Sequence, residues 1–480
     1  MLGRPGGPPL PEPARNDLAA FEAERARAEE SRREVGPGDL LALNDDDLLQ
    51  RLRSDRSFAC EAAWSAAVGR EPRRALRLFS RLVADDAIPA RAALEVAWRV
   101  RGPTSEENLD SEAFRVFADL PTGSLERHPD VASALARFVA AVAERDGGDR
   151  GTGAQLLALW DRLIGPIAAA TSPRRGDAAG ILPIDDLIHT LLLYLERARE
   201  ANDAERRQEI RSRLDRVATD RTAFGAALWE FGRWLPFMND LEPSWTEAHL
   251  LPAFDWAADP ARAGRAWEGY LSGSAVMPAT LWPKMCLPFV AAFQPDHLNG
   301  LSPHAREKLV QVLVGVVLFG VDRSWRDDDA RRALRACDQS MLRSAASLMW
   351  RVVEDEDQPE RRDALWRSRL GHLLQDLWPK EVEKQDRTVW TWLLRMAVAL
   401  DETFTEAVAA ITALPSPPTI ENAGIFDELG KSLHPNRPEH ANAVRRLLSL
   451  LIERLRGHDD EPLTDIEARL AAVGEPLGAR

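Results

Sequence analysis

Apolar residues recur three and four positions apart along nearly the whole chain from about Leu40 onward, which is the spacing of one helix face. The alternating β-branched patterns that are typical of strands are missing. In residues 438–457, one stripe is formed by Val444, Leu447, Leu448, Leu451 and Leu455. Pro438 suits the first helical position there, and Gly457 suits the C-terminal cap. We therefore predict an all-α fold.

Two further segments carry helix-start signals. Residues 183–199 begin with a proline and place Asp185 and Asp186 in the first turn, where carboxylates oppose the helix dipole. The buried face of this segment is predicted to be Leu187, Ile188, Leu191 and Leu195. Ser244 and Glu247 have the spacing of a capping box, in which each side chain satisfies the backbone N–H of the other residue. We expect helices to begin at both places.

A partial internal repeat suggests how the helices are organised. Residues 71–79 align with residues 259–267, and each copy follows a tryptophan, Trp64 or Trp256. A helix started by a proline, Pro89 or Pro278, is expected after each copy. Short Gly- and Pro-containing breaks favour helices that pack as antiparallel neighbours. We predict an irregular, HEAT-like α-solenoid of stacked antiparallel helical hairpins, with compact bundles as the alternative.

The N-terminus differs in composition from the rest of the chain. Residues 1–15 contain five prolines and three glycines, which disfavours both helix and strand. Residues 16–34 alternate Glu and Arg on a helical frame with only Leu18 and Phe21 as large anchors. We assign residues 1–38 to a disordered tail and charged helical arm, 39–175 to an N-terminal helical array, and 176–480 to a C-terminal helical array.

Charge and cysteine content narrow the classes of function. The 480 residues carry a formal net charge of −14, which argues against a general phosphate-binding surface and leaves only a local basic groove as a nucleic-acid alternative. Three widely spaced cysteines fit a reducing compartment. The longest apolar run, 309–319, is far shorter than the roughly 20 residues of a membrane span. With no apolar signal core at the N-terminus, we expect a cytoplasmic protein.

No linear catalytic or cofactor motif is present. The sequence lacks a phosphate-binding Gly-x-x-x-x-Gly-Lys-Ser/Thr loop, a His-Glu-x-x-His metal pair and a Gly-x-Ser-x-Gly nucleophile elbow. The glycine-rich stretch 147–153 could cradle a phosphate, but it follows a helical segment, which favours a connector. We therefore assign no catalytic residue, no cofactor and no metal site.

Several polar clusters have both a functional and a structural interpretation. Asp185 and His189 could form an acid–base or metal pair, because they lie four residues apart. His249 could form a polar cluster with Glu247 and Asp255. Structural roles are favoured for each, since helix starts and surface pairs use the same residue types. The same holds for the remaining candidates, which are Asp327, Asp328, Asp329, His434 and His440.

Tryptophan is the unusual residue, because thirteen of the fifteen lie between Trp160 and Trp392. Core packing is the default role for such large rings, and a ligand-binding aromatic surface is the alternative. Trp390 and Trp392 are two positions apart and cannot share one helix face, so we expect at least one of them to be exposed or to lie between layers.

Three stretches carry a family resemblance: His249 to Trp256, Ala266 to Leu271, and Leu377 to Lys380. Over roughly residues 240–470, the chain resembles a bacterial helical family, domain of unknown function 4020, whose members follow sirtuin-like domains in anti-phage defence proteins. The resemblance implies that the helical part senses infection, or restrains and assembles an NAD-consuming effector. This chain has no Gly-Ala-Gly nucleotide loop and no parallel βαβ pattern, so the effector would be another polypeptide.

Our leading hypothesis is a non-catalytic scaffold or sensor subunit that binds a protein partner, such as a sirtuin-like effector. The alternatives are an enzyme whose site is assembled from distant residues, for example His249, Asp255 and His189, and a nucleic-acid-sensing helical groove. Candidate partner-binding residues are Trp256, Trp267, Trp378, Lys380, Trp390 and Trp392.

Overall fold

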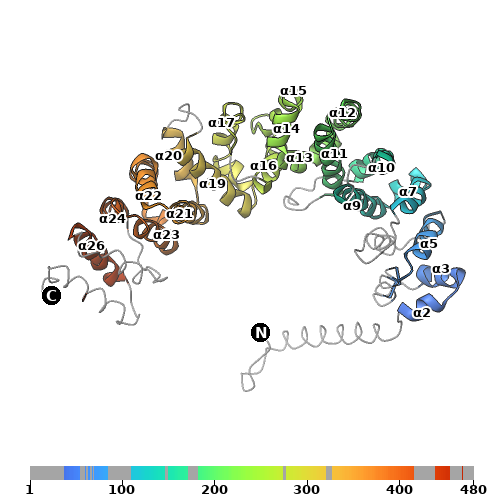
Figure 1. Cartoon of the computed structure of the whole chain (residues 1–480), viewed down its shortest axis with the longest axis horizontal. Helices are drawn as coiled ribbons and strands as arrows, with labels where there is room; N and C mark the ends of the chain where they lie inside the picture. Colours follow the sequence, from blue (N-terminus) through green and yellow to red (C-terminus); the bar gives the residue numbers. More distant parts are fainter. Residues whose placement is uncertain are drawn as a thin grey trace, which may run out of the picture. The chain divides into compact units, whose positions relative to one another are not determined.

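The computed structural model describes residues 37–54, 60, 63–64, 67–68, 70–84, 110–145, 150–170, 182–273, 277–320, 327–415, 438–454 and 468. Every element of regular structure in these ranges is a helix, which confirms the all-α class (Figure 1). The chain divides into two compact units, Met1–Ala227 and Leu228–Arg480, and the division falls inside one helix, α13. The predicted boundary at residues 175 and 176 and the tail up to residue 36 lie outside the described residues, whereas residues 37 and 38 already belong to a helix.

The first unit consists of helices that pack on near neighbours in sequence. Helix α9 contacts α8, α10 and α11; α10 also contacts α7; and α11 contacts α12. The bounds are α2 Pro37–Ala42, α3 Asp45–Ser54, α5 Pro72–Ala84, α7 Asp110–Ala118, α8 Thr122–Arg127, α9 Pro129–Arg145, α10 Arg150–Ala170, α11 Pro183–Glu200 and α12 Ala204–Thr219, with α13 spanning Arg221–Arg233.

The second unit continues with helices of varied type, including three π-helical turns (η1, η3 and η4). The bounds are α14 Leu235–Leu241, α15 Pro243–Trp245, η1 Thr246–Leu250, η2 Leu251–Phe254, α16 Pro260–Gly273, α17 Trp282–Ala291, α18 Pro295–Asn299, α19 Pro303–Phe319, α20 Asp327–Ala336, α21 Gln339–Glu354, α22 Pro359–Leu365, η3 Trp366–Leu370, η4 Leu373–Leu377, η5 Val382–Lys384, α23 Arg387–Val398, α24 Phe404–Thr412 and α26 Pro438–Arg454.

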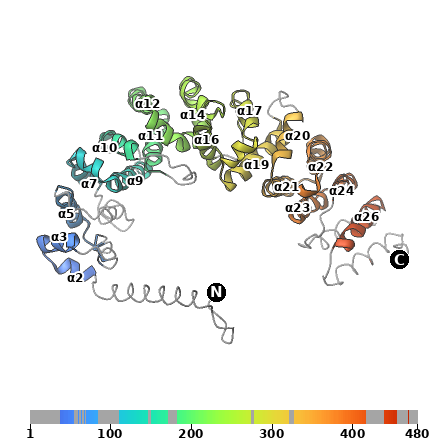
Figure 2. The same ribbon diagram turned by 180° about the vertical axis from the view of Figure 1, so that it is seen from behind.

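Within the second unit, α16, α19, α21 and α23 follow one another as contacting neighbours (Figure 2). Polar pairs join successive members: Ser340 Oγ on α21 donates to Glu307 Oε1 on α19 at 2.6 Å, and Gln311 Nε2 donates to Ser344 Oγ at 2.7 Å. Arg343 of α21 pairs with Asp386, the N-cap residue of α23. We refer to these last three helices as the α19–α21–α23 row.

Two predicted helix starts are confirmed. Helix α11 begins at Pro183, where Asp185 Oδ2 accepts a hydrogen bond from the Leu182 N–H at 2.7 Å, and its four predicted core residues are fully buried. Helix α26 begins at Pro438, and Val444 lies in its buried stripe. The predicted cap at Gly457 lies outside the described residues.

The predicted capping box at Ser244 and Glu247 is wrong. Helix α15 begins one residue earlier, at Pro243, with Glu242 in the N-cap position and without a side-chain cap. The fixed φ and missing N–H of proline suit the first helical position, which moves Ser244 inside the helix. Glu247 instead pairs with Lys284 of α17, with Nζ and Oε1 2.6 Å apart.

The internal repeat is reproduced in its first helix only. Both α5 and α16 begin at the aligned prolines, and the tryptophans before them, Trp64 and Trp256, are both buried. The prediction that Pro278 starts a helix is wrong: α17 begins at Trp282, and the Pro278 carbonyl accepts the amide of Trp282 in a turn. Pro89 lies outside the described residues.

The end of α13 and helix α16 approach each other through glycines. A Cβ placed on Gly269 would lie 1.8 Å from the backbone oxygen of Trp229, and one on Gly232 would lie 2.2 Å from the Ala266 oxygen. Both distances are far below van der Waals contact, so the two backbones touch only because these positions lack side chains. This approach brings the half-buried Trp229 against α16.

None of the described helices combines the length and the apolarity that are needed to cross a membrane. The predicted apolar run 309–319 forms the C-terminal part of α19, where Leu309, Leu313 and Val316 are buried against other helices.

Candidate partner-binding surface

Four of the predicted binding tryptophans are core residues. Trp256 stacks on His297 with ring centroids 4.5 Å apart, and Trp267 packs edge to face against Phe254. The Nε1–H of Trp378 donates to Gln385, and that of Trp390 donates to the Pro415 carbonyl at 3.1 Å. All four rings are at most 2% exposed. Their conspicuous sequence positions are explained by packing and, for Trp267, Trp378 and Trp390, by indole N–H groups that are hydrogen-bonded inside the core.

The other two predicted residues reach the surface. Lys380 is exposed in the turn before η5, and its ammonium group makes no hydrogen bond or ion pair within the described residues. Trp392, on α23, is half-buried, whereas Trp390 is fully buried. The two tryptophans therefore occupy different environments, as their spacing predicts.

Trp392 is part of a cluster that we call the tryptophan platform: Trp350 of α21 with Trp392 and Arg395 of α23. The two indole rings are stacked, with centroids 4.6 Å apart and an angle of 28° between their planes. Arg395 Cζ lies 5.5 Å from each centroid. All three side chains are half-buried, so water reaches a pair of large rings and a guanidinium at one place.

Arg395 does not cover the outer face of either indole ring, that is, the face turned away from the other ring. A group directly above the outer face of one ring would be much farther from the other ring than from the first. Because Arg395 is equidistant from both centroids, its guanidinium lies beside the stack. It contributes a positive charge beside the two rings and covers the outer face of neither.

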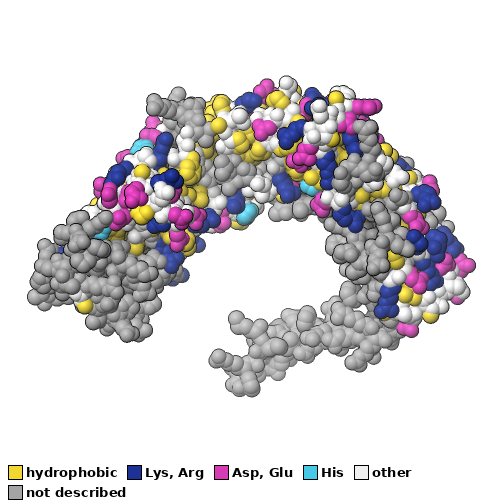
Figure 3. Space-filling view, viewed as in Figure 1, with side chains coloured by type: hydrophobic (Ala, Val, Ile, Leu, Met, Phe, Trp, Pro, Cys, Tyr) yellow, Lys and Arg dark blue, Asp and Glu magenta, His cyan; other side chains and the backbone are white. Residues whose placement is uncertain are grey.

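The platform lies on a surface of mixed charge. The α19–α21–α23 row carries six Lys or Arg and two Glu, and three aspartates cap α21 and α23: Asp338, Asp355 and Asp386. On the face shown in Figure 3, positive and negative side chains are likewise interspersed over the described surface. Stacked tryptophans with an arginine beside them combine residue types that are enriched at interface hot spots.

Sequence reasoning missed Trp350 and Arg395. Trp350 belongs to a different helix from Trp392, and the two are brought together only by the packing of α21 on α23. A signal was present in the local sequence, since Trp350 is followed directly by the exposed Arg351. That pattern places a large ring at the edge of a solvated helix face.

The proposed acid–base pair of the first unit has structural partners. Asp185 is 1% exposed and caps the start of α11. His189, in the same helix, lies with Nε2 3.7 Å from Glu144 Oε1 of α9. The two side chains thus link the helix to different neighbours.

His249 and Asp255, in the second unit, also take separate roles. His249 is exposed and its ring lies 5.2 Å from that of Trp245. Asp255 Oδ1 accepts the amide of Ala257 at 3.0 Å within its own turn. No hydrogen bond or ion pair joins His249 to Asp255 in the described structure.

The acidic run at the start of α20 is used in pairs with basic side chains. Asp328 pairs with Arg331 and Asp329 with Arg332, while Asp327 lies 3.2 Å from His372 Nε2. His372 Nδ1 lies 2.8 Å from Asp376. Burial alone would lower the pKa of His372, but the hydrogen bonds to the two carboxylates raise it. Both ring nitrogens face carboxylates, which favours a protonated ring over a metal-ligating one.

The remaining polar candidates are absorbed into the fold. His440 is buried with its ring 5.0 Å from Phe404, and His434 lies outside the described residues. Of the glycine-rich stretch, residues 150–153 form the first turn of α10, where a Cβ on Gly153 would collide with Arg206. In the described ranges, no three His, Cys, Asp or Glu side chains are placed to hold a metal ion.

Two buried carboxylates hold helix starts in place. Glu268 of α16 accepts from both the N–H and the Oγ of Ser302, the N-cap of α19, and burial raises the pKa of Glu268. Asp363 of α22 accepts from the amides of Asp401, Glu402 and Thr403 and from the Thr403 hydroxyl. Burial would raise the pKa of Asp363, but these hydrogen bonds together lower it.

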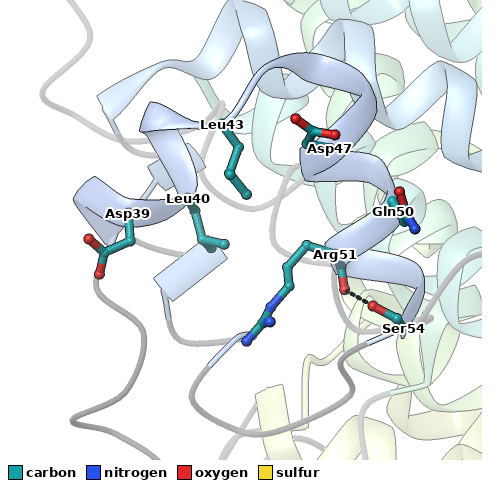
Figure 4. A pocket seen from close by; sticks show the side chains of 7 residues that line it. All are labelled: Asp39, Leu40, Leu43, Asp47, Gln50, Arg51 and Ser54. Atoms are coloured by element: carbon teal, nitrogen blue, oxygen red, sulfur yellow. Dashed lines mark hydrogen bonds between the residues drawn. The ribbon is translucent and has the colours of Figure 1, made fainter.

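A pocket of about 440 Å³ lies between α2 and α3 in the first unit (Figure 4). Its lining combines two leucines with Asp39, Asp47, Gln50, Arg51 and Ser54. The only interaction drawn among these side chains is the Ser54 hydroxyl donating to the Arg51 carbonyl at 3.2 Å. The lining contains no histidine or cysteine, and its one hydroxyl, that of Ser54, donates to a backbone carbonyl, so no hydrogen bond to a general base is shown for it.

Comparison with known proteins adds no assignment: no protein-family model matches the chain, and no curated protein matches it.

Proposed function

We propose that this chain is a non-catalytic helical scaffold or sensor subunit that binds a protein partner. The observation that carries the proposal is the tryptophan platform, in which Trp350, Trp392 and Arg395 form a half-buried cluster. Large rings left partly in water, with an arginine beside them, are typical of the centre of a protein interface.

We further propose that the helices form an irregular α-solenoid of stacked hairpins. Support comes from the order of contacts within each unit: α9 to α12 in the first, and α16, α19, α21 and α23 in the second, pack mainly on near neighbours. In such arrays, successive helices line a continuous surface that suits extended partners. The platform would lie on such a surface, since it joins two successive members of the row.

The proposed setting is bacterial anti-phage defence in the cytoplasm, beside a separate effector such as a sirtuin-like NAD-consuming enzyme. Its support is the resemblance over residues 240–470. In the structure, the resembling residues Phe254, Trp267 and Tyr270 form one buried ring cluster, so they would preserve the fold of the family rather than a reaction. Recognition would then be carried by surface residues outside these motifs.

The test is capture of a partner from cells with and without phage challenge. The tagged wild-type chain should recover one protein in near-equal amount, and Trp350→Ala combined with Trp392→Ala should reduce that recovery. Leu287→Ala is the matched control, because Leu287 is 79% exposed on α17 and does not belong to the platform. Far-UV circular dichroism would confirm that each variant is folded.

Failure to recover any partner in either condition would count decisively against the scaffold proposal. Consumption of NAD by the purified chain alone would contradict the division of labour between scaffold and effector.

A further inference from the structure

We infer that the tryptophan platform recognises an acidic segment of the partner, in which an aromatic side chain extends the Trp350–Trp392 stack while a neighbouring carboxylate pairs with Arg351 of α21. The inference rests on the proposed function and goes further, because it specifies the chemistry of the segment that is bound.

A cation beside the platform supports a carboxylate in the bound segment. Helices α21 and α23 carry four arginines, and these are balanced by Glu354 of α21 and by the aspartates that cap the two helices. The charge that is open to a partner is therefore that of a single arginine, Arg351, and not of a broad patch. A complementary charge at one such position fixes the orientation of the segment that binds there.

Arg351 is the arginine most available to a partner. It is exposed, it follows Trp350 directly, and its guanidinium makes no hydrogen bond or ion pair within the described residues. Arg343, two turns earlier on α21, is already paired with Asp386. A carboxylate of the partner would therefore gain a new charge-assisted hydrogen bond at Arg351 without breaking an existing pair.

The geometry of the stack supports an aromatic side chain. The two indoles already adopt a stacked arrangement with centroids 4.6 Å apart, within the range that aromatic pairs prefer. Arg395 lies beside the stack, at the same distance of 5.5 Å from both ring centroids. A third ring would meet a surface that is already ordered, so little side-chain entropy would be lost on binding.

The same features fit a protein segment better than a nucleic acid. A phosphate backbone is held by several cations in succession, each released from its counterions. In the row, Arg306 and Arg343 are paired with aspartates, and Arg387 and Arg395 have interaction partners as well, so four of its six cations are already engaged. A short segment with a few carboxylates needs fewer free cations.

Fluorescence anisotropy with defined probes tests the inference on the full-length chain. The first probe is a fluorescein-labelled peptide with a central tryptophan flanked on both sides by glutamates. Alanine replaces the tryptophan in the second, and lysines replace the glutamates in the third. A labelled single-stranded oligothymidylate is the fourth. The first probe should bind about tenfold or more tightly than each of the others.

Two charge-reversal variants locate the site. Arg351→Glu should weaken binding of the first peptide about tenfold or more, because a like charge then faces the glutamates. Arg361→Glu is the control, since Arg361 is exposed on α22, outside the row, and should leave binding unchanged. Arg351→Glu changes an exposed residue, so it should leave the thermal midpoint close to that of the wild type.

The inference is overturned if the first peptide shows no saturable binding, if the lysine peptide binds equally well, or if Arg351→Glu has no effect. Tighter binding of the oligothymidylate would assign the platform to nucleic acid instead. Recovery of the same cellular partner by wild type and Arg351→Glu alike would refute this inference while leaving the scaffold proposal intact. Binding of the first peptide without recovery of any cellular partner would support this inference and contradict the scaffold proposal.

Discussion

Substituting Gly269 with alanine tests the close contact between α13 and α16. The added methyl carbon would lie 1.8 Å from the Trp229 oxygen, 2.6 Å from its carbonyl carbon and 2.8 Å from its Cα. Comfortable contacts between such atoms are about 3.5 Å. All three atoms belong to the backbone, so no side-chain rotation relieves the collision, and the two helices must move apart.

The size of the effect follows from two opposing contributions. Overpacking of a well-packed contact costs about 1–3 kcal/mol, and a backbone collision belongs at the upper end of that range. Alanine in place of glycine within a helix returns about 1 kcal/mol. We therefore expect Gly269→Ala to destabilise the second unit by about 2 kcal/mol, which corresponds to a thermal midpoint about 4–8 °C lower.

Gly315→Ala is the matched control. Gly315 lies inside α19, and a Cβ there would meet nothing within 4 Å, so only the gain in helix propensity remains. Its midpoint should rise by a few degrees, given about 1 kcal/mol of stabilisation. Both variants can be measured by differential scanning calorimetry of the full chain. A midpoint for Gly269→Ala equal to or above that of the wild type would refute the backbone contact.

Substitutions at three further positions probe the buried and paired polar groups. The lowered pKa of Asp363 means that its carboxylate stabilises the fold above the unfolded pKa of about 3.9 and loses this contribution as the pH falls through the folded value. Asp363→Asn should therefore cost about 2 kcal/mol at neutral pH and much less in acid, measured by urea unfolding. The raised pKa of His372 has the opposite sign: its stabilisation is complete below about pH 6.5 and is lost as the pH rises through the folded value. The deficit of His372→Gln in the same assay should accordingly shrink with increasing pH, and a deficit that is constant with pH would contradict the ion pairs. Glu268→Ala should destabilise by about 1–3 kcal/mol, because two buried hydrogen bonds to the start of α19 are lost, whereas Glu268→Gln should retain most of that stability.

Helix class and several helix starts could be predicted because their causes are local. Pro183 and Pro438 have a fixed φ, and the apolar spacing after each identifies the buried face from the sequence alone. The same local chemistry explains the failure at Ser244. A capping serine and a first-turn proline competed for adjacent positions, and the proline set the start of the helix.

The candidate site could be predicted only in part, because it depends on which helices become neighbours. The spacing of Trp390 and Trp392 indicated two environments, and the structure shows one ring buried and one half-buried. Trp350 stacks on Trp392 because of the register in which α21 packs against α23. No local sequence pattern predicts that register. Trp256 and Trp267 were conspicuous in sequence for the opposite reason, since large core residues also produce distinctive motifs.

Asp363 also determines what the start of α24 is able to bind. Three successive amides and a hydroxyl that converge on one point form a nest of the kind that captures phosphate or carboxylate ions. Here the anion is tethered to the same polypeptide, so its effective concentration is set by the fold, and a dissolved anion competes with it poorly. The nest is thereby an internal ligand site that is permanently filled, and it joins α22 to α24 as a bound ion would join two separate chains.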